Sequence, residues 1–451
     1  MPHFLVFKQL LRQTLLIVPV AVLIGSTIGF FLWLLNWSVH YRFAYPWLLF
    51  LLPLAGILIH FMYRFTGRSA EKGNNLIIDE IHRPGGGVPW QMAPVVLVTT
   101  VITHLFGGSA GREGTAVQIG GSIAGLFSRW FKLKETEINI LLTAGIAAGF
   151  GAVFGTPLTG AIFALEVLSI GQMKYHALLP ALIASLVADI TVSAWGVHHT
   201  AYHIDILTKT SYLWSNYLNI NLLLLAKVVL AAIIFGLASN MFSVLVHEIK
   251  AFFSNMISIT WLIPFLGGLL IIGLTYLLGK PDYLSLGIDA QYPGAVTIPS
   301  AFHAYGSDTW SWFWKTIYTT ITLGTGFKGG EVTPLFYIGA TLGNTLSAWL
   351  NAPVSLFAAL GFIAVFAGAT NTPLACTIMG IELFGGEHVL FFAVACFTAY
   401  LFSGHTGIYS AQQIAVSKIA AASFTDEKSL QEAGKRRGYF YQKLIRYWLP
   451  K

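Results

Sequence analysis

Two short glycine-rich segments each place a carboxylate just before an apolar run. The first, residues 107–125, reads GGSAGREGTAVQIGGSIAG around Glu113, and the second, residues 324–343, reads GTGFKGGEVTPLFYIGATLG around Glu331. Glycines that lead into an apolar run predict a loop feeding a helix N-terminus, whose unpaired N–H groups attract anions. A carboxylate placed there can occupy the anion site and leave it when it is protonated. The chemistry that these segments favour is exchange of a proton for an anion.

Each segment also has a simpler interpretation. Glu113 would merely cap its own helix while Arg112 neutralises it, and Lys328 would form a surface ion pair with Glu331 in a tight turn. We favour a functional role for Glu113 because ionisable residues inside a membrane are costly and usually functional.

In the second segment Thr333 and Pro334 are expected to form the N-cap and first turn of the following helix. The backbone amides near Gly330, Glu331 and Val332 are expected to face the same anion as the first segment.

Two isolated residues have weaker signals. Asn74, in GNNLIIDEIH, carries an amide that can donate to an anion, although a Gly-Asn pair is usually only a turn. The Asp79, Glu80 and His82 side chains that follow are expected to form a solvated helix face. Tyr409, in SGHTGIYSAQQ, would by itself be an ordinary interfacial tyrosine.

The composition is that of a polytopic helical membrane protein. Of 451 residues, 55% are hydrophobic and only 10% are charged, whereas soluble domains carry about 25% charged residues. Long uncharged stretches, such as 15–35 and 45–62, can cross or deeply enter a bilayer. The net charge of +7 reflects basic residues beside the first apolar run and in the last 25 or so positions. This distribution favours a multi-pass protein of the inner (plasma) membrane with both termini in the cytoplasm.

The chain contains a long-range duplication. Aligning Glu113 with Glu331, 218 positions later, pairs Thr115 with Thr333 and Gly121 with Gly339. A second match aligns GTPLTGAIFALE, ending at Glu166, with NTPLACTIMGIE, ending at Glu382, at an offset of 216 positions. We therefore predict a first membrane repeat over 1–215, a second over 216–426 and a basic cytoplasmic tail over 427–451.

Several apolar segments are too short to span a membrane upright and are interrupted by glycine or proline. They include 92–106, 115–127, 138–150 and 356–366. Such segments in corresponding places of two repeats indicate a transporter whose discontinuous helices meet near the middle of the membrane.

Together these motifs resemble those of the CLC family of chloride channels and anion/proton exchangers. GREGT at 111–115 resembles the family's GREGP, and GGEVTP at 329–334 resembles its GGxFxP. Tyr409 falls where the family has a pore tyrosine, and GNNLI at 73–77 stands where it has GSGIP. The resemblance covers roughly residues 10–425.

Where this sequence departs from the general family pattern, it resembles the sequences of the family's fluoride-exporting branch. Asn74 replaces the pore serine, Thr115 the proline after the gating glutamate, and Val332 the pore phenylalanine. The inner proton-relay glutamate of chloride exchangers corresponds to Val167 here. This difference argues against a chloride-type inner proton route. It does not exclude proton coupling, because the fluoride branch lacks that glutamate as well.

The resemblance implies an all-α inverted-repeat fold, a homodimer in membrane lipid, and a fluoride/proton antiporter that uses no cofactor or metal and is not an enzyme. A chloride/proton exchanger or chloride channel is the alternative. Glu113 would be the gating and proton-transfer residue. The residues implied at the anion site are Asn74, Gly114, Gly330, Val332, Thr333 and Tyr409, with Gly111, Arg112, Thr115, Gly329, Glu331 and Pro334 as motif support.

A nucleic-acid-binding role is not expected. An intramembrane enzyme would need a nucleophile with its base, or paired metal ligands, and the sequence signals neither.

Overall fold

The computed structural model describes residues 2–66, 68–204, 221–418 and 429–433. In these residues the regular secondary structure is almost entirely helical, which confirms the all-α expectation. The α-helices are α1 (Pro2–Ala44), α2 (Leu52–Thr66), α3 (Asn74–His82), α4 (Met92–Leu105), α5 (Glu113–Trp130), α6 (Glu135–Phe154), α7 (Pro157–Glu166), α8 (Leu178–Ala194), α9 (Leu222–Met256), α10 (Leu262–Leu278), α11 (Ser311–Gly324), α12 (Val332–Leu350), α13 (Val354–Thr370), α14 (Pro373–Phe384) and α15 (Val389–Phe402). Short 3-10 helices are η1 (Pro46–Leu51), η2 (Arg68–Lys72), η3 (Tyr175–Ala177), η4 (Ser300–Phe302) and η5 (Gly386–His388), and a two-residue parallel pair joins β1 (Ser169–Ile170) to β2 (Gln413–Ile414).

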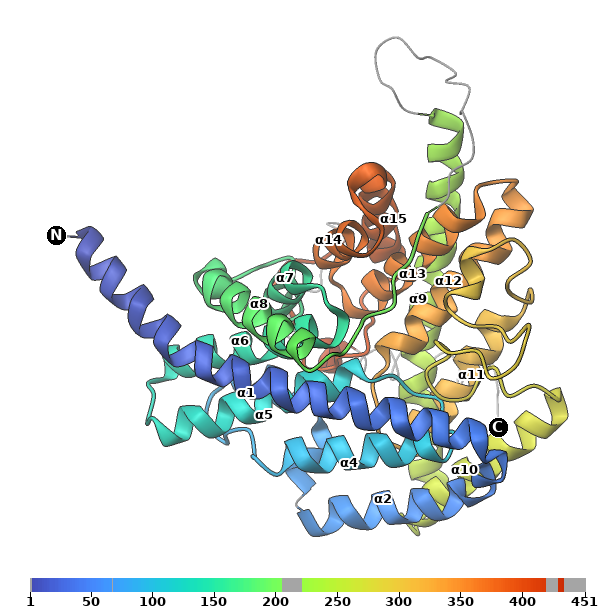
Figure 1. Cartoon of the computed structure of the whole chain (residues 1–451), viewed down its shortest axis with the longest axis horizontal. Helices are drawn as coiled ribbons and strands as arrows, with labels where there is room; N and C mark the ends of the chain where they lie inside the picture. Colours follow the sequence, from blue (N-terminus) through green and yellow to red (C-terminus); the bar gives the residue numbers. More distant parts are fainter. Residues whose placement is uncertain (1, 67, 205–220, 419–428, 434–451) are drawn as a thin grey trace, which may run out of the picture.

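The two halves of the chain form two groups of helices (Figure 1). α1 packs against α4, α5, α6 and α8, while α9 packs against α11, α13 and α15. The groups meet where α10 lies against α2 and where α14 lies against α7. Segments far apart in the sequence thereby lie side by side.

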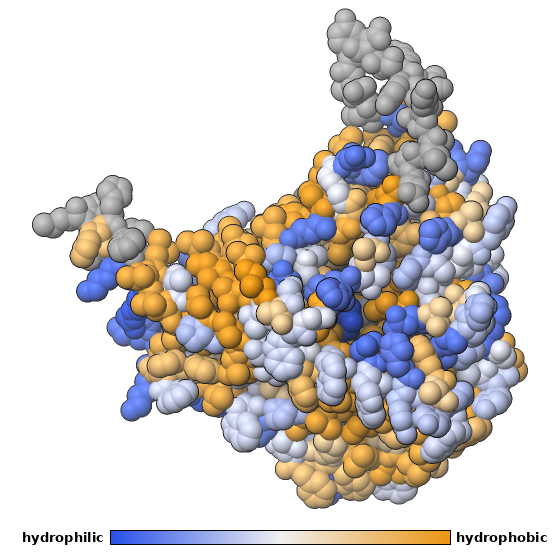
Figure 2. All heavy atoms as spheres, in the orientation of Figure 1, coloured by the Kyte–Doolittle hydropathy of each residue, from blue (hydrophilic) through white to orange (hydrophobic). Residues whose placement is uncertain are grey.

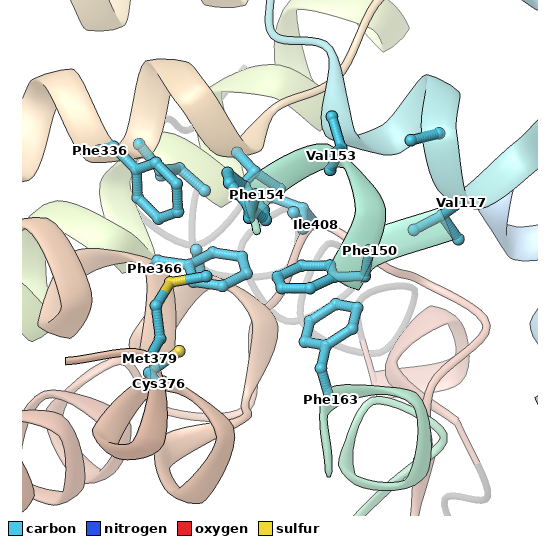
Figure 3. Close-up of a cluster of buried hydrophobic side chains, with 14 of the residues drawn as sticks. Val117, Phe150, Val153, Phe154, Phe163, Phe336, Phe366, Cys376, Met379 and Ile408 are labelled. Carbon is cyan, nitrogen blue, oxygen red and sulfur yellow. The ribbon is translucent and has the colours of Figure 1, made fainter. Parts of the chain in front are cut away.

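An aromatic cluster fills the space between the two groups (Figure 3). Phe150 of α6 stacks on Phe163 of α7 with ring centroids 4.2 Å apart, and Phe366 of α13 lies 6.1 Å from Phe150. Phe336 of α12 stacks on Phe362 of α13 at 3.8 Å. Lipid is as apolar as these rings, so close packing rather than burial from water holds the cluster together.

Glycines let the pore helices and their partners approach closely. A Cβ on Gly145 of α6 would lie 2.6 Å from the carbonyl oxygen of Gly120 in α5. In the other half, a Cβ on Gly339 of α12 would lie 2.0 Å from the carbonyl oxygen of Gly361 in α13. Small residues at these crossings are the expected means of packing helices in a membrane.

The duplicated glutamates at the ends of α7 and α14 cap each other's helices. The carboxylate of Glu166 accepts hydrogen bonds from the N–H groups of Leu374 (3.0 Å) and Ala375 (2.8 Å) at the start of α14. The carboxylate of Glu382 accepts from Leu158 (2.9 Å) and Thr159 (2.8 Å) at the start of α7. This reciprocal contact satisfies helix N-terminal donors of both halves and joins them.

We expect Glu382→Gln to destabilise the fold while leaving the transport site intact. The amide keeps one acceptor oxygen and turns an NH2 group toward an N–H donor, so the loss should be about 1–2 kcal/mol. Thermal unfolding of the purified protein in detergent would measure it. Glu387→Gln is the control because Glu387 is exposed in η5. Equal melting temperatures for the two variants would contradict the capping role.

The surface fits a membrane environment. Among the described residues, five helical stretches are long and apolar enough to cross a bilayer: Leu10–Ala44, Pro46–Thr66, Glu135–Phe154, Tyr175–Ala194 and Leu222–Met256. Figure 2 shows hydrophobic surface over α8 and over the end formed by α2 and α10. Other apolar helices, such as α4, α7 and α14, have only 10–17 residues, as expected for discontinuous segments.

The predicted repeat boundaries remain a prediction. The boundary at 215 and most of the basic tail lie outside the described residues.

Candidate anion site

The two glycine-rich loops meet at a single antiparallel bridge between Gly111 and Gly330. The N–H of Gly111 donates to the carbonyl of Gly330 at 2.6 Å, and the N–H of Gly330 donates to the carbonyl of Gly111 at 2.7 Å. Ala110 lies close to Gly329, because a Cβ added to Gly329 would be 2.5 Å from the Cβ of Ala110. The bridge brings the N-termini of α5 and α12 to one point, as the sequence predicted.

The carboxylate of Glu113 lies at the N-terminus of α12 and not only at that of its own helix. Its Oε2 accepts hydrogen bonds from the N–H of Thr333 (3.0 Å) and the N–H of Arg112 (3.1 Å), and its Oε1 accepts one from the Thr333 hydroxyl. The side chain is 1% exposed. A buried carboxylate is thus held by helix N-terminal donors of the other half of the chain, which is an environment that favours an anion.

Arg112 is a modest counter-charge. Its Nε lies 3.8 Å from Oε1 of Glu113, and its side chain is 21% exposed. The simpler interpretation, in which Glu113 caps α5 and Arg112 neutralises it, therefore accounts for only part of the contacts. It leaves out the two donors from Thr333.

The structure corrects the expected role of Thr333 as an N-cap. The cap residue of α12 is Glu331, and Thr333 is the second residue inside the helix. Its hydroxyl is free to bond Glu113 because it is not spent on its own helix end. Pro334 follows inside the first turn, where its missing N–H costs no hydrogen bond.

Backbone donors come mainly from the start of α5. The first N–H groups of a helix lack partners within it, and here these belong to Glu113, Gly114 and Thr115. A Cβ on Gly330 would lie 2.7 Å from the Gly114 nitrogen. The N–H of Gly330 itself is bonded to Gly111, so it is not available to an anion in this conformation, contrary to expectation.

Asn74 lies beside these donors as the first residue of α3. A Cβ on Gly114 would be 3.2 Å from its Nδ2, so the amide faces the start of α5. Asn74 is 8% exposed, and its Oδ1 has no hydrogen-bond partner among the described residues. Gly73 has φ +58°, and a Cβ there would lie 3.2 Å from Nε2 of Gln118 in α5. Gln118 is thus a second amide close to the start of α3, which the sequence reasoning did not single out.

Tyr409 and Val332 are both buried, at 4% and 1% exposure. Tyr409 lies at the start of a turn in which the N–H of Gln412 donates to its carbonyl, and β2 follows directly. Its ring meets Phe163 edge-on with centroids 6.5 Å apart. The β1–β2 pair and this ring contact hold Tyr409 against α7.

A second carboxylate approaches the same point. Oε2 of Glu331 would lie 3.6 Å from a Cβ on Gly114. Lys328 directs its ammonium over the Tyr63 ring, 4.4 Å from the centroid. Two glutamates therefore lie near the start of α5, one from each half of the chain.

Sequence reasoning also missed a buried polar chain behind the bridge. The Nζ of Lys315 donates to the carbonyl of Ser285 at 2.7 Å, whose hydroxyl lies 3.0 Å from Nδ1 of His104. Nε2 of His104 lies 3.4 Å from the carbonyl of Gly111. Ionisable residues in otherwise apolar segments were the available signal, but neither belongs to a glycine-rich motif.

The expected solvated face of α3 is wrong for Glu80. That side chain is 8% exposed and accepts hydrogen bonds from the N–H groups of Gly85 (2.9 Å) and Gly86 (3.2 Å). His82 lies 2.9 Å from the carbonyl of Leu168. The physical reason is that the loop after α3 folds back and supplies donors that the sequence pattern does not reveal.

Short helices that direct their N-termini at a buried carboxylate inside a membrane protein are typical of transporters of small anions. The voltage-gated chloride channel family model matches residues 54–404. A Pseudomonas syringae pv. tomato protein described as a chloride/fluoride channel protein is 47% identical over 88% of this chain and 86% of its own length. The chain therefore belongs to the CLC family.

Further relatives and solved structures agree with this assignment. An H(+)/Cl(-) exchange transporter of Yersinia pestis is 27% identical over 71% of this chain and 68% of its own length. The crystal structure of a CLC-type fluoride/proton antiporter superposes with a TM-score of 0.82, at 33% identity, over 91% of this chain and 99% of that one. A slow cyanobacterial Cl-/H+ antiporter has the same fold, with a TM-score of 0.70 at 20% identity.

Proposed function

We propose that this protein exports fluoride in exchange for protons and that Glu113 carries the proton. The observation that carries the proposal is the Glu113 carboxylate bound by the backbone and hydroxyl of Thr333 at the start of α12. A fluoride ion can replace that carboxylate because the same donors suit either anion.

Protonation is the step that would release the site. A neutral carboxylic acid loses the attraction of the helix N-termini, and one of its oxygens becomes a donor. Glu113 would then leave Thr333, and the vacated N–H and hydroxyl would bind the anion. Deprotonation would return the carboxylate and expel the anion, so that proton and anion pass in opposite directions.

The amide-rich surroundings support fluoride as the anion. Fluoride is small and strongly hydrated, so an anion site must offer close donors in place of water. Asn74 supplies an amide beside Gly114, and the Thr333 hydroxyl is a further donor once Glu113 leaves. The names of the Pseudomonas relative and of the superposed antiporter both include fluoride.

Reconstituted vesicles provide the test. Vesicles loaded with fluoride should lose it through the purified protein while protons enter, and the proton flux should be recorded in the same sample. We expect fluoride efflux to exceed chloride efflux by at least about tenfold, the ratio given by 1.4 kcal/mol of selectivity. Rapid chloride exchange without a fluoride preference would instead favour the alternative, a chloride/proton exchanger such as the Yersinia relative.

The assembly and orientation are part of the same proposal. We infer a homodimer in the inner membrane, with both termini in the cytoplasm and with the two repeats inverted relative to each other. The reciprocal caps of Glu166 and Glu382 support the repeat relationship. Cross-linking in native membranes and cysteine labelling from each side would test these points.

A further inference from the structure

A small cavity lies between Glu113 and the segment that follows α8. It has a volume of about 20 Å³, enough for about one water molecule. Arg112, Glu113, His199, Tyr202 and Thr333 line it, together with aromatic and aliphatic side chains. This cavity brings the Glu113 carboxylate and an imidazole into one space.

The His199 ring fits in this position because the residue at the end of α6 is a glycine. Gly155 has φ +71°, and a Cβ there would lie 2.4 Å from Cδ2 of His199. The ring therefore lies directly over the backbone of Gly155. A substituted residue would displace the imidazole from the cavity.

One ring nitrogen of His199 points toward a second acid. Its Nε2 lies 4.0 Å from Oδ1 of Asp189 near the end of α8, and it makes no hydrogen bond among the described residues. The side chains of His199 and Asp189 are 20% and 21% exposed. A line of proton-binding groups thus leads from partly exposed Asp189 through His199 to buried Glu113.

The electrostatic surroundings keep the imidazole neutral. Burial, and then the charge of Arg112, lower the pKa of His199 to about 4. A neutral imidazole can accept a proton on one nitrogen and release one from the other. Among the described residues, the charged or titratable groups near His199, Asp189 and the cavity include Arg112, Glu113, His198, Tyr202, Asp289 and Glu382.

We propose that His199, which lies beside Asp189, passes protons between Glu113 and the aqueous side reached through Asp189. The proton arrives at one ring nitrogen, the other nitrogen gives its proton to a water in the cavity, and that water protonates the Glu113 carboxylate. One proton enters and one leaves, so the imidazole stays neutral but is left as its other tautomer, and a ring flip or an exchange with water restores the starting tautomer before the next transfer. The inference rests on the proposed proton-coupled exchange and adds a path by which protons reach Glu113.

His199→Ala, assayed in vesicles with fluoride and proton fluxes recorded together, tests the relay. We expect proton-coupled flux to fall by about tenfold or more and to be restored in part by added imidazole, which a merely structural role would not produce. Asp189→Asn should show a smaller loss and a shifted pH profile. His198→Ala is the matched control because His198 is its exposed neighbour.

The outcomes separate this inference from the proposed function. If the unaltered protein shows no proton-coupled fluoride flux, the proposed function fails, and the variants are then compared in whatever anion exchange it does perform. If the unaltered protein is coupled and His199→Ala matches it, the relay is wrong. A folded His199→Ala protein with reduced flux that imidazole does not restore also overturns it, because the ring would then be needed only for structure.

Discussion

Glu113→Gln is expected to abolish proton-coupled exchange, with a loss of about 10²-fold or more. The amide cannot take up and release a proton at this position. It also directs an NH2 group toward donors of Thr333 that now bind carboxylate oxygens. Fluoride-driven proton uptake into vesicles would measure the change directly.

Glu135→Gln is the matched control for that variant. Glu135 is the first residue of α6, as Glu113 is of α5, but its side chain is exposed. We expect this variant to retain full coupling. If Glu113→Gln retained full coupling as well, Glu113 would not be the proton carrier and the proposed mechanism would be wrong.

Gly330→Ala is expected to reduce anion flux at least about tenfold because the added methyl group would enter the site itself. Its Cβ would lie 2.7 Å from the Gly114 nitrogen and 3.1 Å from the Glu113 nitrogen. Relieving that overlap requires the two loops to separate at the Gly111–Gly330 bridge. Overpacking of this kind costs about 1–3 kcal/mol of stability, so flux should be compared at equal amounts of folded protein.

The control for Gly330→Ala is Gly273→Ala in α10. A Cβ on Gly273 would meet no atom within 4 Å, and alanine is the better helix former by about 1 kcal/mol. This variant should transport normally and be at least as stable as the unaltered protein. Normal flux in Gly330→Ala would mean that the loops can separate without loss of the site. The close approach of Gly330 to the start of α5 would then not be needed for transport.

The sequence predicted those parts of the fold and candidate site that depend on local pattern. Low charge and long apolar stretches indicate a membrane protein whatever the tertiary arrangement, because the hydrocarbon core of a bilayer accommodates mainly apolar helices whose backbone hydrogen bonds are satisfied internally. The glycines around Glu113 and Glu331 predict helix starts, and α5 and α12 begin at Glu113 and Val332. The duplication could also be recognised, since the repeated motifs retain their spacing.

The sequence reasoning was wrong or silent wherever a residue's partner lies far along the chain. It expected Thr333 to cap its own helix, whereas the hydroxyl bonds Glu113, which is 220 positions away. It expected the N–H of Gly330 to face the anion, whereas that N–H donates to the carbonyl of Gly111. In the sequence, Glu166 was noted only as part of the duplicated motif. Its hydrogen bonds to α14 follow from the packing of two helices from different halves of the chain.

By itself, then, the sequence determined the environment of the chain, the repeated motifs and the helix starts that can attract an anion, because each follows from composition or from a few neighbouring residues. Only the tertiary structure decided which donors hold the Glu113 carboxylate, that Glu80 is buried, and that His199 shares a cavity with Glu113. Those facts depend on how two helix groups meet, and no short stretch of sequence carries that information.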